Sequence, residues 1–329
     1  MTDKPAVSSW RPSRRDVLVL GVAGFAAAVP FARRHPLSLV RRNVLVMGTL
    51  AEFAVAHRDP AQAQVAIDAA ITALQTVDDT MSLFKPSSDI GRANLAAARE
   101  ASAVSDGTMA VLREGLQWAS ASDGAFDPCL GAATTLWDVA HRQEPPPEAA
   151  LGRFANRRLY RALELGEHAG VPVVRFHDRD VRLDLGGIAK GYGVDCAVAA
   201  LRAHGVEHAL VGAGGDLYAL GRSPAGEPWR IGIQSPERPD ALAGTLRLEN
   251  AAVATSGDYR QFFDYDHRRY HHLLDPRTAA PRRSAQHSVS VVAATCMAAD
   301  AGATLAFGRA GADLTAVLAR HGARIAHRV

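Results

Sequence analysis

The sequence predicts an α+β fold, because helical patterns and short strand-like runs follow one another in mixed order rather than as regular βα repeats. Its 329 residues are enough for one large domain or two small ones with an ample core. A content of 48% hydrophobic and 22% charged residues is ordinary for a globular protein. The proline-rich stretch 142–149 indicates a surface loop too short to be a flexible linker between domains. We therefore expect one folded unit of packed helices and short strands.

The first half of the chain is expected to hold a long strand and two helices. Residues 43–56 have the character of a strand that is interrupted at Met47-Gly48-Thr49. Apolar residues recur near helical spacing from Pro60 to Met81, and Pro86 prevents the helix from continuing. Residues 87–95 are expected to form a loop, and a second helix is expected over 106–121, capped by Ser105 or Asp106.

The second half is expected to alternate short strands with three helices. Short strand-like runs separated by turn residues fill 157–183. The further strand patterns cover 208–211, 229–234, 244–255, 287–293 and 323–327. The helical patterns cover 192–204, 295–307 and 314–320.

Charge and cysteine content exclude several classes of protein. The formal net charge is +3 and acidic residues are interspersed throughout, so no groove for nucleic acid is indicated. The three cysteines, Cys129, Cys196 and Cys296, show no CxxC spacing, which argues against structural zinc and against a dense disulfide framework. We expect solvent-shielded thiols, with a single bridge left open as an alternative.

The N-terminus carries the pattern of an export signal. Arg14 and Arg15 precede an apolar and small-residue run over 17–32, about 16 residues long and short of the ~20 that span a bilayer. A twin arginine before such a run predicts a Tat-type signal, so we assign 1–42 to a signal and basic linker and 43–329 to the folded domain. The protein would then be periplasmic, or held on the outer side of the inner membrane by an uncleaved signal. The alternative is a basic tail followed by a buried helix.

The stretch from Asp184 to Asp195 (DLGGIAKGYGVD) is the strongest candidate for a phosphate site. It follows a strand-like run at 181–183 and opens into a helical pattern. Gly186 and Gly187 let the backbone approach a ligand closely, and a helix start directs unpaired N–H groups at it. Lys190 adds a positive charge there. Neither a P-loop nor a GxGxxG fingerprint is present, so an ordinary strand-to-helix connection remains the alternative.

Two further groups of residues suggest chemistry. Asp300 and Thr304 lie four apart on a predicted helix, hence on one face, and with a backbone carbonyl and phosphate oxygens they could complete a magnesium shell. Alternatively, Asp300 caps the helix or faces solvent, and Thr304 packs. His271 and His272 precede Asp275 in HHLLDPRT, where histidine could be a general base, a metal ligand or a polar loop residue.

A polar turn at Ser256 and Gly257 could supply hydroxyl and N–H donors to a nucleotide. It follows a strand-like run and precedes Asp258 and Tyr259. A hydrolase nucleophile elbow would need GxSxG, which this turn does not match.

These blocks occur together in one order that resembles the ApbE family, the bacterial FAD:protein FMN transferases. DLGGIAKGY and HHLLDPRT are the specific motifs, and the resemblance runs from about residue 43 to 307. The shorter blocks are Met47-Gly48-Thr49, Ser82-Leu83-Phe84 with Asn94, residues 124–128 (GAFDP), Gly214-Gly215-Asp216, residues 255–258 (TSGD), and Ala299-Asp300 with Thr304.

The resemblance implies a single catalytic domain of mixed sheets and packed helices with a cleft between two subdomains. Such an enzyme binds FAD and Mg²⁺ or Mn²⁺, splits the pyrophosphate, transfers FMN to a Thr or Ser hydroxyl of an acceptor protein and releases AMP. It implies that the carbonyl of Gly187, with Asp300 and Thr304, binds the metal, and that His272 and Asp275 lie beside the phosphates, with His272 taking the hydroxyl proton. The residues it places around FAD are Met47, Phe84, Ala125, Phe126, Asp127, Asp184, Lys190 and Leu274.

Departures from the family pattern are few, and two other functions stay open. Ala303 stands where some members carry a further acidic metal ligand, which puts metal affinity in doubt. The same site in a metal-dependent FAD pyrophosphatase would use water in place of the protein hydroxyl. A periplasmic flavin-binding protein without turnover is the alternative from another class.

Overall fold

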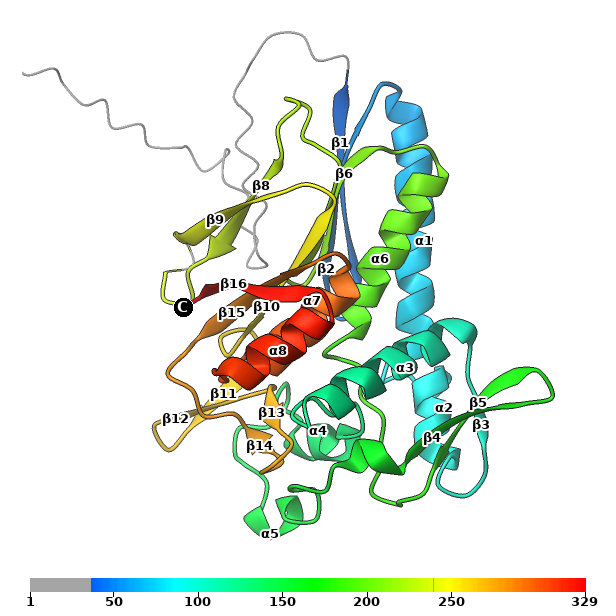
Figure 1. The fold of residues 1–329 in the computed structure, drawn as a ribbon, viewed down its shortest axis with the longest axis vertical. Helices are drawn as coiled ribbons and strands as arrows, with labels where there is room; N and C mark the ends of the chain where they lie inside the picture. Colours follow the sequence, from blue (N-terminus) through cyan, green and yellow to red (C-terminus); the bar gives the residue numbers. More distant parts are fainter. Residues whose placement is uncertain (1–36, 239) are drawn as a thin grey trace, which may run out of the picture.

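The computed structural model describes residues 37–238 and 240–329, so the twin arginine and the apolar run 17–32 of the predicted export signal lie outside the described residues. Residues 38–42, which we assigned to the basic linker, belong to the first strand of the folded domain. Its centre is a seven-stranded sheet in which every neighbouring pair is antiparallel (Figure 1). In sheet order the strands are β1 (Ser38–Val46), β2 (Thr49–His57), β6 (His208–Ala213), β7 (Asp216–Leu220), β10 (Ala251–Gly257), β15 (Ser288–Ala293) and β16 (Ala323–Arg328).

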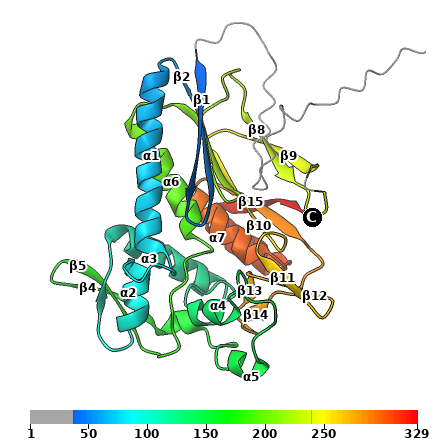
Figure 2. The same ribbon diagram turned by 180° about the vertical axis from the view of Figure 1, so that it is seen from behind.

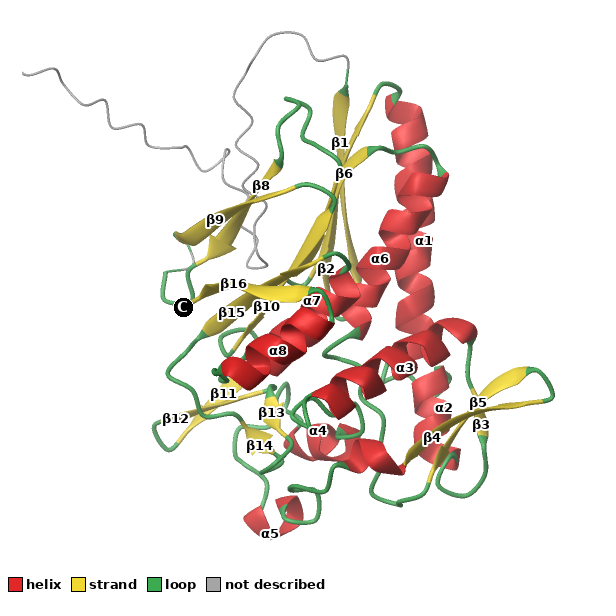
Figure 3. Cartoon of the chain, in the orientation of Figure 1, coloured by secondary structure: helices red, strands yellow, loops and turns green. Residues whose placement is uncertain are grey.

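The two faces of this sheet are covered differently (Figure 3). Successive side chains of a strand point to opposite faces, so Ala252 and Ala254 of β10 pack in the main core while Val253 belongs to a second cluster, with Trp229, on the other side. The helices α1 (Pro60–Met81), α6 (Ala189–Ala203), α7 (Cys296–Ala306) and α8 (Ala312–Arg320) contribute to the main core. The hairpin of β8 (Trp229–Gln234) and β9 (Leu242–Leu248) covers the second face.

A smaller, helix-rich part lies beyond the Met81 end of α1 (Figure 2). It contains α2 (Asp89–Ala96), α3 (Asp106–Ala121), α4 (Gly131–Trp137), α5 (Glu148–Leu151), a 3₁₀ turn (Leu159–Ala162), and a sheet of β3 (Ser102–Ala103), β5 (Val171–Phe176) and β4 (Leu163–His168). Two hairpins lie between the parts, β11 (Phe262–Tyr265) with β12 (Arg268–His271), and β13 (Leu274–Asp275) with β14 (Ala280–Pro281). Asn94 and Thr134 of the smaller part form hydrogen bonds with Leu183 and Asp184, so the two parts meet at the glycine stretch.

The α+β prediction is confirmed. The predicted interruption of the run 43–56 at Met47-Gly48-Thr49 is confirmed as well, because Met47 and Gly48 both have positive φ (53° and 66°) and form the tight turn of an antiparallel hairpin. The run 244–255 breaks at Asn250 (φ 49°) into β9 and β10, which pair with different strands.

Two shorter segments also differ from prediction. Residues 87–95, expected as a loop, contain helix α2, because the Ser88 hydroxyl accepts a hydrogen bond from Gly91 N (2.8 Å) and caps it. The run 181–183 is not a strand and makes only one bridge, between Leu130 and Arg182. No helix within 37–238 or 240–329 is both long and apolar enough to cross a bilayer.

Candidate functional site

Helices α6 and α7 cap each other, and this brings their N-terminal turns together. The Asp300 carboxylate on α7 accepts a hydrogen bond from Gly191 N of α6 (3.0 Å). In return Asp195 on α6 accepts from Cys296 N (2.7 Å) and Met297 N (2.9 Å) at the start of α7. A Cβ at position 191 would stand 2.3 Å from the Cys296 carbonyl oxygen, so only glycine permits this approach. The positive ends of two helix dipoles therefore meet in one place, which favours a negatively charged ligand.

The same crossing places Gly187 against Thr304. A Cβ at position 187 would stand 2.9 Å from Thr304 Cγ2 and 3.0 Å from Thr304 Oγ1. One turn earlier on α7, Asp300 is 3% exposed at its side chain. The predicted juxtaposition of the glycine turn with the Asp300–Thr304 face is present in the structure.

Lys190 joins two buried carboxylates at this point. Its Nζ lies 2.8 Å from Asp216 Oδ2 and 3.2 Å from both oxygens of Asp300. Burial raises the pKa of Asp216 to about 7; the Asp300 charge adds to this and Lys190 opposes it. Although burial opposes it, the two carboxylates raise the pKa of Lys190 above its ordinary value, so the ammonium remains charged. The lysine charge at the helix start is thus shared with acids rather than free for a phosphate.

Asp216 was not among the predicted site residues. The available signal was the Gly214-Gly215-Asp216 block, which forms the tight turn from β6 to β7 with positive φ at both glycines (59° and 99°). This turn directs the aspartate towards Lys190.

The oxygen atoms near Gly187 fit a hard divalent cation. Within the described residues, Thr304 Oγ1 makes no hydrogen bond, and no group of three His, Cys, Asp or Glu side chains could hold a metal. One carboxylate, one hydroxyl and one backbone carbonyl are a small set of oxygen donors. Mg²⁺ takes such a set when ligand phosphate oxygens and water complete its shell.

His272 is neutral and holds a defined tautomer. It is half-buried, and its Nδ1 lies 3.3 Å from the Gln261 carbonyl oxygen, which can only accept. Nδ1 therefore carries the proton and Nε2 is free to accept one. Burial lowers the pKa of His272 to about 4, with the charges of Lys190 and Arg260 adding to the effect. Gln261 follows Arg260, whose Nη2 lies 3.4 Å from the position of a Cβ on Gly215, so the contact with Gln261 places His272 on the side of the β6–β7 turn that carries Asp216.

The other residues of the HHLLDPRT motif bind their own loop. His271 is buried, and its Nε2 contacts the Arg282 carbonyl oxygen (3.0 Å). Asp275 accepts from Arg277 N (3.0 Å) and pairs with the Arg277 guanidinium (3.1 Å). Although burial opposes it, these contacts lower the pKa of Asp275, so it stays ionised.

The residues expected around FAD lie in different environments. Met47 Sδ lies 3.1 Å from the position of a Cβ on Gly193, so it packs on α6. Phe84, just beyond α1, is 83% exposed. Asp184 accepts from Gly186 N (2.9 Å) and from Thr134 Oγ1 (2.7 Å), which fixes the glycine turn.

The GAFDP loop and Leu274 are also among the residues expected around FAD. Phe126 is buried, and Asp127 accepts from Cys129 N (2.9 Å), while burial raises the pKa of Asp127 to about 6. The Ala125 carbonyl oxygen accepts a hydrogen bond from Arg282, and Leu274 pairs with Pro281 in the β13–β14 hairpin.

Arg282 ties these segments together, and no sequence pattern pointed to it. Its buried guanidinium donates to the carbonyls of Thr304 (2.7 Å), Leu305 (3.1 Å) and Phe307 (2.9 Å) at the end of α7, and to that of Ala125 (2.8 Å). Burial lowers the pKa of Arg282 to about 10, which leaves it charged at neutral pH. One side chain therefore connects the helix of the oxygen donors with the GAFDP loop.

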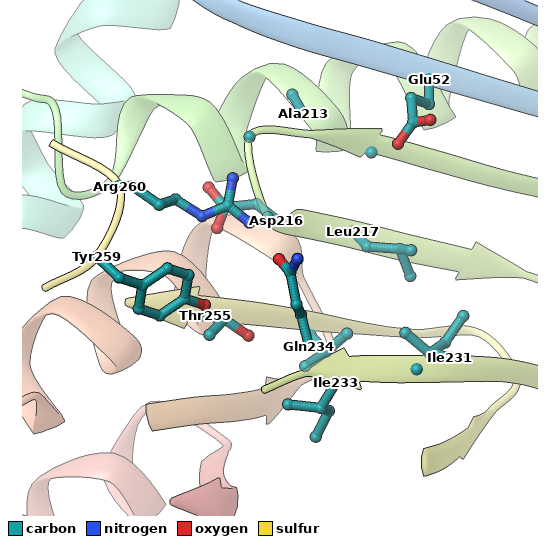
Figure 4. Close-up of a pocket in the computed structure, with 15 residues that line it drawn as sticks. Glu52, Ala213, Asp216, Leu217, Ile231, Ile233, Gln234, Thr255, Tyr259 and Arg260 are labelled. Carbon is teal, nitrogen blue, oxygen red and sulfur yellow. The ribbon is translucent and has the colours of Figure 1, made fainter. Parts of the chain in front are cut away.

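Ser256 and Gly257 lie at the end of β10, where a Cβ on Gly257 would meet Tyr259 and the His287 carbonyl oxygen. The Ser256 side chain makes no hydrogen bond within the described ranges, whereas the neighbouring Thr255 hydroxyl contacts that of Ser290 (2.8 Å). Tyr259 and Arg260, which follow directly, line a cavity together with Asp216 (Figure 4).

The class of protein that these features define is an α+β enzyme. The features are the oxygen donors, the buried lysine–aspartate group and the neutral histidine. Comparison with known families is more specific: the model of the ApbE family matches residues 47–327. The chain belongs to the ApbE family.

Relatives and solved structures agree with this assignment. A protein of Treponema pallidum named FAD:protein FMN transferase is 35% identical over 312 residues, covering 89% of this chain and 84% of the relative. One of the same name from Vibrio cholerae is 32% identical, covering 70% and 69%. The crystal structure of the ApbE protein of Thermotoga maritima aligns with a TM-score of 0.79 at 28% identity, covering 88% of this chain and 93% of the other. The flavin transferase ApbE of Vibrio cholerae aligns at 0.75, covering 88% and 93%.

Proposed function

We propose that this protein is a metal-dependent FAD:protein FMN transferase that attaches FMN to a threonine or serine of an acceptor protein and releases AMP. The observation that carries the proposal is the meeting of Gly187, Asp300 and Thr304 at two helix starts, with a neutral His272 nearby. The names of the relatives supply the substrate, FAD, and the kind of acceptor, a protein.

In this proposal Gly187, Asp300 and Thr304 hold Mg²⁺, which would neutralise negative charge on the pyrophosphate when bound. The first N–H groups of α6 and α7 donate to Asp300 and Asp195, so only the positive ends of the two helix dipoles favour the phosphate charge here. Lys190 keeps Asp216 and Asp300 in place and compensates their charge. Met47, Phe84, the GAFDP loop, Asp184 and Leu274 bind the rest of FAD.

The transfer step then needs one proton acceptor. The acceptor hydroxyl oxygen forms a bond to the phosphorus of the FMN half, and the bond from that phosphorus to the bridging pyrophosphate oxygen breaks, so that AMP leaves. The hydroxyl proton passes to His272 Nε2, the nitrogen that the Gln261 contact leaves unprotonated. Such a base typically contributes about 10²–10⁴ in rate. Asp275, held by Arg277, keeps this loop in position.

The twin-arginine segment supports export, so we place the reaction outside the inner membrane. Expression with residues 1–42 fused to a reporter, compared with the same fusion carrying Lys at positions 14 and 15, tests this. Reporter that reaches the periplasm equally with both versions contradicts a Tat-type signal.

The decisive experiment compares two aspartates with mirror-image structural roles. Asp300→Asn and Asp195→Asn each weaken one of the reciprocal helix caps, but only Asp300 belongs to the proposed cation site. Each variant is incubated with FAD, Mg²⁺ and a pool of short peptides that have one fixed threonine and randomised flanks, and flavin-bearing peptides and AMP are measured by mass spectrometry. We expect Asp300→Asn to abolish transfer and Asp195→Asn to retain it, and chelation by EDTA to stop the wild type.

Three outcomes would contradict the proposal. Equal loss of transfer in both variants would indicate that Asp300 acts only by capping a helix and does not bind a cation. Release of FMN and AMP by the wild type without any labelled peptide would indicate the pyrophosphatase instead. Unchanged FAD in the presence of Mg²⁺ and peptides would indicate a flavin-binding protein without turnover.

A further inference from the structure

A basic cavity of about 490 Å³ lies between the β11–β12 hairpin and the segment 282–287 that precedes β15. Binding sites for small ligands measure about 300–1,000 Å³, so this space is large enough for a bound group. Four of the side chains that line it are arginines and only two are carboxylates. The arginines are Arg268 and Arg269 of β12, with Arg282 and Arg283 of the segment before β15. Figure 1 shows the hairpin at the periphery of the fold, where a partner can reach it.

The two carboxylates of the lining are already paired. Asp258 Oδ2 lies 2.9 Å from His287 Nδ1, and Asp264 Oδ1 lies 3.5 Å from Arg269 Nε. These acids therefore do not balance the charge of the remaining arginines.

Three guanidinium groups of the lining have no carboxylate partner. Arg268 and Arg283 form no ion pair within the part of the chain that the structure describes. The Arg282 guanidinium donates to backbone carbonyl oxygens, which carry no net charge. The cavity therefore favours a ligand that brings negative charge.

Aromatic rings hold the two arginines of β12 in defined positions. The guanidinium carbon of Arg268 lies 4.6 Å from the centre of the Tyr270 ring, and that of Arg269 lies 3.9 Å from the centre of the Phe262 ring. A guanidinium group that stacks on a ring keeps the N–H groups in its own plane available as donors. Such a planar pair of donors matches the two oxygens of a carboxylate. The hairpin is therefore preorganised to bind acidic side chains.

The hairpin is continuous with the proposed base. The Gln261 carbonyl oxygen, just before β11, accepts a hydrogen bond from His272 N (3.2 Å) and lies 3.3 Å from His272 Nδ1, just after β12. Arg269 precedes His272 by three residues, which span about 10 Å along an extended strand. An extended partner covers the same distance with about three residues. An acidic residue a few positions from a hydroxyl residue therefore spans the gap between this cavity and the base.

The other wall of the cavity adjoins the proposed cation site. Arg282 lines the cavity, and its Nη1 donates to the Thr304 carbonyl oxygen (2.7 Å). None of the residues assigned to FAD or to the cation lines the cavity. The cavity is thus next to the reaction centre but is not needed for either ligand.

We propose that this cavity binds acidic residues of the acceptor protein that flank its threonine or serine, and so presents the hydroxyl group to His272. Complementary charges at such a patch supply selectivity and faster association. The position beside His272 favours the acceptor over a free anion or a membrane surface, because only the acceptor has to reach this base. This assignment rests on the proposed transferase function.

Reversing the two unpaired charges tests the assignment. The cavity variant combines Arg268→Glu with Arg283→Glu, and the control variant combines Arg58→Glu with Arg175→Glu, exposed positions outside the cavity with the same change in net charge. Each protein is incubated with FAD, Mg²⁺ and the pool of threonine peptides with randomised flanks. We expect the peptides labelled by the wild type to be enriched in Asp and Glu within about four positions of the threonine. This enrichment should disappear with the cavity variant and persist with the control variant.

Kinetics with single peptides separate acceptor binding from the chemical step. The set is one acidic peptide from the labelled pool, its counterpart with Asn and Gln, and its counterpart with Lys. We expect the cavity variant to raise the KM for the acidic peptide at least about tenfold, because like charges brought together across an interface cost more than an exposed ion pair contributes. The KM for FAD should stay unchanged. The Lys peptide should be labelled better by the cavity variant than by the wild type, which a folding defect would not produce.

Equal labelling of the acidic and the Asn/Gln peptides by the wild type, or a wild-type KM for the acidic peptide in the cavity variant, would overturn this site while leaving the transferase function intact. Weaker binding of inorganic phosphate or of anionic lipid vesicles by the cavity variant, without any preference among the peptides, would overturn it in favour of another anion. Absence of any labelled peptide with the wild type would overturn both the site and the transferase function.

Discussion

Replacing Gly187 by alanine tests whether the approach of two distant chain segments builds the site. The added Cβ would stand 2.9 Å from Thr304 Cγ2, and ordinary contact begins at 3.4 Å, so the segments must separate by about 0.5 Å (3.4 − 2.9). The backbone at position 187 does not have the positive φ that disfavours alanine, so the effect comes from this contact alone. Thr304 cannot yield easily, because Ala299, Ala301 and Ala303 hold α7 in the core with no exposed surface.

We expect the free energy of unfolding to fall by about 1–3 kcal/mol, as for other overpacked sites. A misplacement of reacting groups on the ångström scale costs on the order of 10²-fold in rate, so transfer should fall by roughly 10- to 100-fold. The measurements are Mg²⁺ affinity by titration calorimetry in the presence of FAD, transfer rate, and thermal unfolding.

Two matched variants isolate the cause. Gly152→Ala, far from the glycine turn in the sequence, meets only the Ala149 carbonyl oxygen at 3.8 Å, has a helical φ of −55°, and should behave as wild type. Thr304→Ser removes the closest atom, Cγ2, and should partly restore metal affinity when combined with Gly187→Ala. Wild-type metal affinity and transfer in Gly187→Ala would refute the reasoning that Gly187 and Thr304 share one site.

Three other predictions follow from buried groups. The pKa of folded His272 lies near 4, below the ordinary 6.5, so the folded chain binds fewer protons than the unfolded chain between these values and its stability is lost as pH falls from 6.5 to 4. His272→Gln should flatten the dependence of the unfolding temperature on pH in this window. An unchanged slope would contradict the lowered pKa. Arg282→Met leaves four carbonyl oxygens without their donor and should lower the free energy of unfolding in urea by about 3 kcal/mol or more. Arg283→Met changes an exposed neighbour and should lower it little. Equal effects of the two variants would contradict the structural role of Arg282. Cys129 and Cys296 are free and buried, and burial raises the pKa of both thiols, so Ellman's reagent should leave them unmodified until the protein unfolds; rapid reaction of all three thiols in the native protein would show that they are exposed.

Periodic patterns predicted the elements whose packing is regular. The helix Pro60–Met81 was predicted with its start at Pro60 and its apolar stripe through Met81, and it ends a few residues before Pro86, which was expected to stop it. Prediction failed at Asn250, a non-glycine residue with a positive φ, since asparagine does not require that conformation. Helix α2 was missed because its start depends on a single serine cap at Ser88 and its apolar content is low.

Local patterns marked the glycine stretch and the Asp300–Thr304 face as candidates, and the family motifs singled them out. The motifs gave Gly187, Lys190, Asp300 and Thr304, which the structure gathers at the crossing of α6 and α7. The pairing of Lys190 with Asp216 depends on how the β6–β7 turn sits over that crossing, and the contacts of Arg282 depend on where α7 ends. Both are tertiary facts that no local pattern records.

The reciprocal capping of α6 and α7 makes the chain indivisible at this point. A fragment that stops before Cys296 would keep the glycine turn and Lys190 but would leave the amide of Gly191 and the carboxylate of Asp195 without partners. The segment from Cys296 onwards therefore cannot be removed or exchanged as an independent module. Any rearranged version of the protein, whether split or circularly permuted, has to restore this crossing before it can regain its reaction centre.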